Sequence, residues 1–273
     1  MSLEQHSPDP VNKIQLFIRA SRSLIFYFFW ISFTLLWFIP SFLLALLLPA
    51  KAKHFIIAVF YSQVIIWAAR IICGIKWQLI GKENLPSDNS GYVVLSKHQS
   101  TWETFFLSTL LYPQVPVIKA ELAQLPIFGW MLSMLNPIWI DRTKKTNALK
   151  QVIEQGKQRL IQGVSVLVFP EGTRVPPGQR KTFSKGGALL ATSTKAPVIA
   201  VAHNSGEYWS NSDWVKKPGT IKVVISPVFN TETLTTKDLH YQVESWINQT
   251  VDKVSTVVFS GEYSQSADSG KRF

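Results

Sequence analysis

The chain has 273 residues and carries 28 Lys and Arg against 17 Asp and Glu, which gives a formal net charge of +11. Because 47% of the residues are hydrophobic and only 16% are charged, a disordered polycation is excluded. The single cysteine, Cys73, excludes an internal disulfide and a cysteine-based zinc cluster. The positive charge leaves three kinds of partner open: nucleic acid, anionic lipid and a phosphorylated small molecule.

The N-terminal quarter of the chain is strongly apolar. Residues 24–48 form a run of 25 residues without a charge, which is long enough for a membrane segment. Pro40 divides this run, and a second uncharged run, 55–69, covers only about 22 Å at ~1.5 Å per residue. Basic residues flank both runs, so the positive-inside rule gives no clear direction of crossing. A hairpin in one leaflet, a spanning hairpin, a single span and a soluble helical hairpin all stay open.

From about residue 77 onward, short apolar runs separated by Gly, Pro, Asn and Asp alternate with helical patterns, which is typical of an α/β fold. We predict a central mixed sheet flanked by helices, preceded by an N-terminal membrane-embedded two-helix segment. The predicted strands are 76–80, 92–96, 115–119, 165–169, 197–202 and 221–225. The predicted helices are 101–111, 127–135, 146–162, 186–194 and 238–254. In the third of these helices, one apolar face is predicted to hold Leu149, Val152, Ile153, Leu160 and Ile161.

These elements divide the chain into three parts. Residues 1–75 are expected to form a membrane-anchoring helical segment, 76–258 an α/β domain, and 259–273 a flexible polar tail.

A histidine and a carboxylate lie where the predicted strand 92–96 runs into a helix. His98 follows the strand, and Glu103 comes five residues later. A carboxylate beside an imidazole orients the ring and stabilises its protonated form, which makes the histidine a general base. The residues from Ser100 to Glu103 are also a good capping box, with Ser100 as N-cap. The two roles of Glu103 are compatible.

Two further strand ends carry groups suited to an anionic ligand. The apolar strand 165–169 runs into Pro-Glu-Gly-Thr-Arg at 170–174. Gly172 allows a close approach of the backbone, and Arg174 offers a planar fork that fits phosphate. Lys119 ends another strand and can supply a second positive charge. An ordinary tight turn with a surface arginine, and a solvated lysine, are the alternatives.

Together these segments resemble the lysophosphatidic acid acyltransferases, also called 1-acylglycerol-3-phosphate acyltransferases, of the glycerolipid HX4D superfamily. Four family motifs match in order, at 98–103, 119–129, 169–174 and 196–201. The resemblance covers roughly 77–229. Two positions depart from the usual pattern: the aspartate of the first motif is Glu103, and the asparagine that often precedes the histidine is Lys97.

The resemblance implies an enzyme that moves a fatty acyl group from a thioester of coenzyme A or acyl carrier protein to the free hydroxyl of lysophosphatidate, making phosphatidate. It implies His98 as general base, with Glu103 steadying the imidazolium. Lys119 and Arg174 would hold the acceptor phosphate, and Glu171, Gly172 and Thr173 would shape the glycerol site. We expect no metal, and no cofactor besides the acyl thioester co-substrate.

The expected partners are lysophosphatidate, the acyl thioester, the lipid bilayer and acyl carrier protein, without nucleic acid. The expected location is a bacterial inner membrane, with the catalytic domain on the cytoplasmic side. An acyltransferase acting on another lysolipid stays open as an alternative. A serine hydrolase is a weaker alternative, because the chain lacks G-x-S-x-G and Ser100 is only two residues from His98. His203, which follows the fourth motif, is expected to have a structural or site-lining role.

Overall fold

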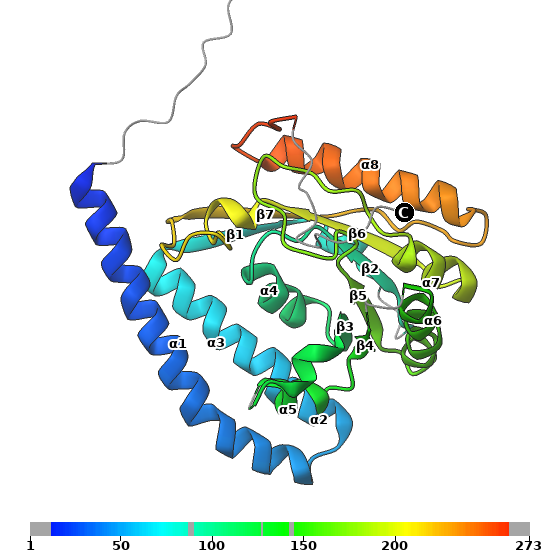
Figure 1. The fold of residues 1–273 in the computed structure, drawn as a ribbon, viewed down its shortest axis with the longest axis horizontal. Coiled ribbons are helices and arrows are strands. Elements are labelled where there is room, and N and C mark those ends of the chain that lie inside the picture. Colours follow the sequence, from blue (N-terminus) through cyan, green and yellow to red (C-terminus); the bar gives the residue numbers. More distant parts are fainter. Residues whose placement is uncertain (1–11, 87–89, 127, 142–144, 262–273) are drawn as a thin grey trace, which may run out of the picture.

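A seven-stranded sheet forms the centre of the protein, in a computed structural model that describes residues 12–86, 90–126, 128–141 and 145–261 (Figure 1). The strand order is β1-β7-β6-β2-β5-β3-β4. The strands are β1 (Ile75–Ile80), β2 (Val93–Ser96), β3 (Gln114–Lys119), β4 (Ile138–Ile140), β5 (Ser165–Val168), β6 (Val198–His203) and β7 (Gly219–Ile225).

The sheet is mixed, as the sequence predicts. Strands β6, β2, β5, β3 and β4 run parallel to one another, β7 is antiparallel to β6, and β1 is parallel to β7. All six predicted strands are present, with ends that differ by no more than two residues. Strand β4 was not predicted, because an apolar stretch of four residues between Asn136 and Asp141 is too short to indicate a strand.

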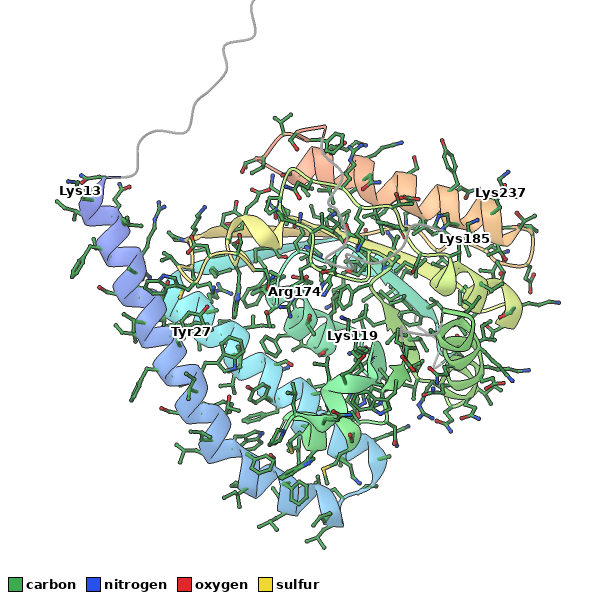
Figure 2. The ribbon with its side chains drawn as sticks, in the orientation of Figure 1. Lys13, Tyr27, Lys119, Arg174, Lys185 and Lys237 are labelled. Atoms are coloured by element: carbon green, nitrogen blue, oxygen red, sulfur yellow. The ribbon has the colours of Figure 1, made fainter. Side chains whose placement is uncertain are left out.

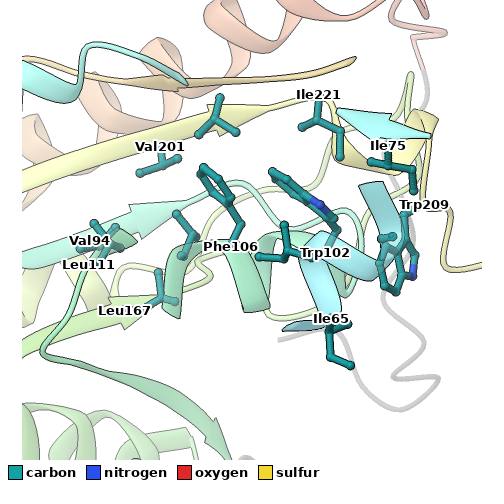
Figure 3. Close-up of a cluster of buried hydrophobic side chains, with 14 of the residues drawn as sticks. Ile65, Ile75, Val94, Trp102, Phe106, Leu111, Leu167, Val201, Trp209 and Ile221 are labelled. Atoms are coloured by element: carbon teal, nitrogen blue, oxygen red, sulfur yellow. The ribbon is translucent and has the colours of Figure 1, made fainter. Parts of the chain in front are cut away.

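Helices cover both faces of the sheet, and the alternation of side chains along each strand separates two cores. Val94 points into a core that it shares with Trp102 and Phe106 of α4 (Trp102–Leu110) (Figure 3). Its neighbours Val93 and Leu95 point into the opposite core. That second core is closed by three helices, which are α6 (Lys145–Ile161), α7 (Gly186–Thr194) and α8 (Thr236–Val254). The short helix α5 (Phe128–Ser133) packs on a 3₁₀ turn, Ala120–Gln124, that follows β3.

Two long helical stretches precede the sheet. Helix α1 (Lys13–Leu47) has 35 residues, and Ala50–Cys73 is helical throughout. The second stretch comprises α2 (Ala50–His54), the π-helical η1 (Phe55–Phe60), α3 (Tyr61–Ala68) and the π-helical η2 (Ala69–Cys73). By length and composition both stretches are apolar enough to cross a membrane.

Both helical stretches are longer than the uncharged runs that the sequence shows. Pro40 lies inside α1 and does not end it; the Ser41 hydroxyl donates to the Trp37 carbonyl at 2.6 Å, one turn back. The second stretch has 24 residues instead of 15, because Lys51, Lys53 and Arg70 at its ends are also helical. At ~1.5 Å per residue it is about 36 Å long, so its length does not argue against a crossing.

The N-terminal helices share a core with the sheet domain on one side and expose apolar side chains on the other. Phe26 of α1 is fully buried, with its ring edge-on to Trp209 at 5.1 Å. Trp30 donates to the Tyr61 hydroxyl at 2.9 Å, which ties α1 to α3. On the outer face, Phe28 is 75% exposed, and Phe17 and Leu36 are exposed to a similar degree. The N-terminal helical segment is therefore packed on the domain that it precedes.

Two further expectations concern the apolar face of α6 and the start of the predicted tail. In α6, Val152 is buried, but Leu149 and Ile161 are exposed, so the predicted apolar face was too wide. The helix contacts β4, β5 and α7 along a narrower stripe. At the start of the predicted tail, Ser260 donates its backbone N–H to the Gly178 carbonyl at 2.8 Å. Residues 262–273 lie outside the described residues.

The two phenylalanines of α1 provide a test of this packing. We expect Phe26→Ala to destabilise the protein by about 3–5 kcal/mol, because it leaves a cavity in a fully buried site. Phe28→Ala, two residues along the same helix, should change stability by less than about 0.5 kcal/mol. Thermal unfolding of both variants in the same detergent measures the difference. Equal destabilisation would show that α1 does not pack as described.

Candidate active site

The ends of the parallel strands bring the predicted site residues to one edge of the sheet. Leu95 of β2 pairs with Val168 of β5, so the chain after β2 runs beside the 169–174 turn. Strand β3, which ends in Lys119, is the next neighbour of β5. Because these strands are parallel, their carboxyl ends meet at the same edge, where ligands of such sheets bind.

His98 and Glu103 are in direct contact. The turn between β2 and α4 folds the five-residue spacing back on itself, and His98 Nδ1 lies 2.9 Å from Glu103 Oε1. An ionised carboxylate only accepts hydrogen bonds, so Nδ1 carries the proton and Nε2 is the nitrogen that can accept one. The His98 ring stacks on Phe169 at 4.0 Å between centroids and keeps 15% of its surface exposed. This is the arrangement of an oriented general base.

Glu103 is buried and surrounded by donors. Its carboxylate accepts from the backbone N–H groups of Gln99 and Ser100, each at 2.8 Å, and from the Ser205 hydroxyl at 2.8 Å. Burial by itself raises the pKa of a carboxyl, but the neighbouring His203 and His98 rings and the Ser100 hydroxyl outweigh it and hold the pKa of Glu103 well below its usual range. Glu103 is therefore a carboxylate at neutral pH.

The predicted capping box differs by one residue from the structure: α4 begins at Trp102 with Thr101 as its N-cap, and Thr101 makes no side-chain capping bond, so Ser100 is not the N-cap. Ser100 and Glu103 still hydrogen bond around the start of the helix. The Trp102 backbone N–H donates to Ser100 Oγ at 3.0 Å, and Glu103 reaches back to the Ser100 N–H. The same carboxylate therefore closes the start of α4 and holds the histidine ring.

Glu171 occupies a different place from the one that the sequence led us to expect. Its carboxylate forms a fully buried ion pair with the Lys97 ammonium, and its second oxygen accepts from the His98 backbone N–H at 2.8 Å. Burial raises the pKa of the Glu171 carboxyl, and the Lys97 ammonium opposes that rise. The Glu171 side chain is therefore fully buried and directed at Lys97 and at the backbone of His98.

The rest of the 169–174 turn lies beside His98. Gly172 has a left-handed backbone, with φ of 70°, and donates to the Phe169 carbonyl at 3.0 Å. Thr173 is half-buried. The residue after Arg174, Val175, donates to the His98 carbonyl at 2.8 Å, which places the arginine next to the histidine.

Arg174 and Lys119 are the two cations predicted to bind phosphate. Arg174 Nη1 donates to Asn211 Oδ1 at 2.8 Å, and its buried Nε has no hydrogen-bond partner among the described residues. Lys119 is exposed at the end of β3. Figure 2 labels both residues near the centre of the molecule in this view. Arg174 therefore has unused donor capacity next to the histidine.

Sequence reasoning missed three participants of this site: Phe169 as a stacking partner, Ser205 as a donor to Glu103, and Lys97 as the partner of Glu171. None of them carries a local signal, because each contact joins residues that are far apart along the chain. His203 is buried, as a structural role requires, and its Nε2 lies 2.8 Å from the Lys97 carbonyl, to which it donates.

The arrangement does not support a serine nucleophile. The Ser100 hydroxyl is buried and hydrogen bonds to Glu103 and Ser205. Across the described residues, no group of three or more His, Cys, Asp and Glu side chains is placed to hold a metal ion.

Comparison with known proteins identifies the family of the chain. A family model described as Acyltransferase matches residues 76–204. The 1-acyl-sn-glycerol-3-phosphate acyltransferase of Pseudomonas aeruginosa is 41% identical over 243 residues, which cover 88% of this chain and 94% of that protein. The chain belongs to the 1-acyl-sn-glycerol-3-phosphate acyltransferase family. It is an acyltransferase enzyme.

More distant relatives extend the comparison. The 1-acyl-sn-glycerol-3-phosphate acyltransferase alpha of Mus musculus is 31% identical over 63% of this chain and 61% of that protein. The crystal structure of the 1-acyl-sn-glycerophosphate acyltransferase PlsC from Thermotoga maritima has the same fold, with a TM-score of 0.72 and 22% identity over 87% of this chain and 97% of that one. The overall fold is therefore shared with this protein.

Two variants of Glu103 distinguish the contribution of its charge to catalysis from the contribution of its side-chain length. We expect Glu103→Gln to lower kcat by at least about 100-fold, because the amide cannot stabilise the imidazolium and turns an NH₂ toward several donors. Glu103→Asp keeps the charge and should lose less than about 10-fold. Acyl-transfer rates of the purified variants provide the measurement. A greater loss in Glu103→Asp would mean that geometry matters more than charge.

Proposed function

We propose that this acyltransferase moves a fatty acyl group from a thioester to the free hydroxyl of lysophosphatidate and so makes phosphatidate. The observation that carries the proposal is the His98–Glu103 pair, 2.9 Å apart at the sheet edge where the Arg174 turn also lies. The relatives named above as 1-acyl-sn-glycerol-3-phosphate acyltransferases support the choice of acceptor.

The reaction is a direct attack in this proposal. His98 Nε2 removes the proton of the acceptor hydroxyl, and the hydroxyl oxygen attacks the thioester carbonyl carbon. The tetrahedral intermediate then collapses, the C–S bond breaks, and the leaving thiolate takes the proton from the imidazolium. Glu103 stabilises the imidazolium throughout. No acyl-enzyme forms, and no metal or further cofactor takes part besides the thioester of coenzyme A or acyl carrier protein.

The acceptor phosphate is assigned to Arg174, with Lys119 as a second positive charge. Arg174 lies next to His98 and has a buried Nε without a described partner, and a guanidinium matches phosphate with two parallel hydrogen bonds. Gly172 and Thr173 would lie along the glycerol, because they precede Arg174 in the turn that runs beside His98.

The enzyme is further proposed to work at a membrane, because lysophosphatidate and phosphatidate both reside in bilayers. The exposed apolar face of α1 and its 35-residue length support an association with lipid. The excess of positive charge adds attraction to anionic headgroups. We assign the enzyme to a bacterial inner membrane, with the sheet domain on the cytoplasmic side, where acyl-coenzyme A and acyl carrier protein are found.

An acyl-transfer assay tests the reaction. The purified enzyme is offered acyl-coenzyme A and acyl carrier protein thioesters against a panel of lysolipids, and we expect transfer to lysophosphatidate above all. His98→Ala should retain less than about 0.1% of kcat, because the base is lost. Arg174→Ala should raise the KM for lysophosphatidate by about 10-fold or more without a similar change for the thioester. Near-normal kcat in His98→Ala would rule out the base assignment.

Binding to lipid vesicles tests the membrane proposal. The triple variant Phe17→Ser, Phe28→Ser, Leu36→Ser should bind vesicles that contain anionic lipid at least about 10-fold more weakly than the wild type, because it removes exposed apolar area from α1. Ile161→Ser is the control, since Ile161 is 76% exposed but lies on α6 of the sheet domain. Flotation on a density gradient measures both. An equal decrease in the two proteins would contradict binding through α1.

A further inference from the structure

The peptide group that precedes the catalytic histidine is held from both sides by buried titratable residues. The Lys97 carbonyl accepts from His203 Nε2 at 2.8 Å, and the His98 N–H donates to Glu171 Oε2 at 2.8 Å. His203 ends β6, and Glu171 follows β5, so the two strands on either side of β2 each supply one contact.

The Glu171 contact depends on a second buried charge. Lys97 and Glu171 are ion-paired with side chains that are 1% and 0% exposed. Removing two charges from water costs free energy that their attraction often only offsets. A buried ion pair therefore does not by itself indicate that the pair serves stability. The Lys97 ammonium favours the ionised form of Glu171 and so opposes the rise in pKa that burial causes, and an ionised carboxylate is the stronger acceptor for the His98 N–H.

We propose that Lys97 and Glu171, together with His203, are positioning residues that hold the 97–98 peptide and thereby aim His98 Nε2 at the acceptor hydroxyl. The proposal rests on the proposed function of His98 as general base. Glu103 fixes the ring only at Nδ1, and Phe169 fixes only its plane. A fixed backbone removes the remaining freedom, and small errors in the position of a catalytic group commonly reduce rates strongly.

This assignment differs in a measurable way from a Glu171 that touches the acceptor. A residue that binds the substrate equally in its ground and transition states changes KM, whereas a residue that aims the base changes kcat. Loss of the ion pair should therefore appear in kcat, with little change in the KM for lysophosphatidate.

The experiment compares Lys97→Met, Glu171→Gln and the double variant Lys97→Met/Glu171→Gln in the full-length enzyme. Lys97→Met leaves the buried Glu171 carboxyl without its cation, so this carboxyl should take up a proton and become a weaker acceptor for the His98 N–H. We expect kcat to fall about 10- to 100-fold, with the KM for lysophosphatidate within twofold of the wild type. The loss should shrink as the pH rises and the carboxyl ionises.

The kcat of the double variant should be at least about fivefold higher than the kcat of Lys97→Met. Its kcat should also lack the pH dependence that Lys97→Met introduces. It removes both charges while the amide oxygen at position 171 can still accept from His98. It also keeps the test decisive if Lys97→Met does not fold. The matched control is Lys150→Met/Glu154→Gln, which removes an exposed i,i+4 pair with N–O 3.7 Å and should leave kcat unchanged.

Three results would overturn the proposal: an unchanged kcat in Lys97→Met, a raised KM for lysophosphatidate with unchanged kcat in Glu171→Gln, or a double variant that is no better than Lys97→Met. A readout without turnover separates this proposal from the proposed function. Diethyl pyrocarbonate should modify His98 several-fold faster in Lys97→Met than in the wild type, as measured by mass spectrometry. If the wild type acylates no lysolipid, the proposed function fails, while the modification rates still test the positioning of His98.

Discussion

The buried carboxylate of Glu103 is the interaction on which the site depends. It accepts from the His98 ring, from two backbone N–H groups at the start of α4, and from Ser205 after β6. A carboxylate that is removed from water needs several hydrogen-bond donors. Here the donors belong to the segments that form the site. The helix start, the histidine ring and the end of β6 are consequently held together by one group.

The order of the parallel strands is the second feature on which the site depends. Strands β6, β2 and β5 are parallel neighbours, so residues after their ends meet at one edge although they are about 70 to 100 positions apart along the chain. His98 leaves the middle strand and is contacted from both sides. The N-terminal helices pack on the α4 face of the same sheet, where Phe26 contacts Trp209. An apolar surface suited to lipid is therefore rigidly joined to the domain that holds the histidine.

Most of the fold could be predicted from local patterns, and the failures have local causes. Strand β4 contributes only three residues, which is too few to show a period. Proline in the interior of a helix usually breaks or kinks it. Helix α1 nevertheless continues through Pro40, because the hydrogen bonds of its other turns and its packing against α3 maintain it. Leu149 and Ile161 follow the helical period of α6 but lie beyond the width of the surface that the sheet covers. A periodic pattern states which side chains share a face, and not how much of that face is buried.

The sequence by itself determined six of the seven strands, the helices that flank the sheet, the His98–Glu103 spacing and the turn that carries Arg174, because each of these is encoded within a few neighbouring residues. Only the tertiary structure decided that Lys97 is the partner of Glu171, that Ser205 donates to Glu103, and that His203 holds the Lys97 carbonyl. These contacts join residues 74 to 106 positions apart. No local rule relates such positions, because strand order and register alone bring them together.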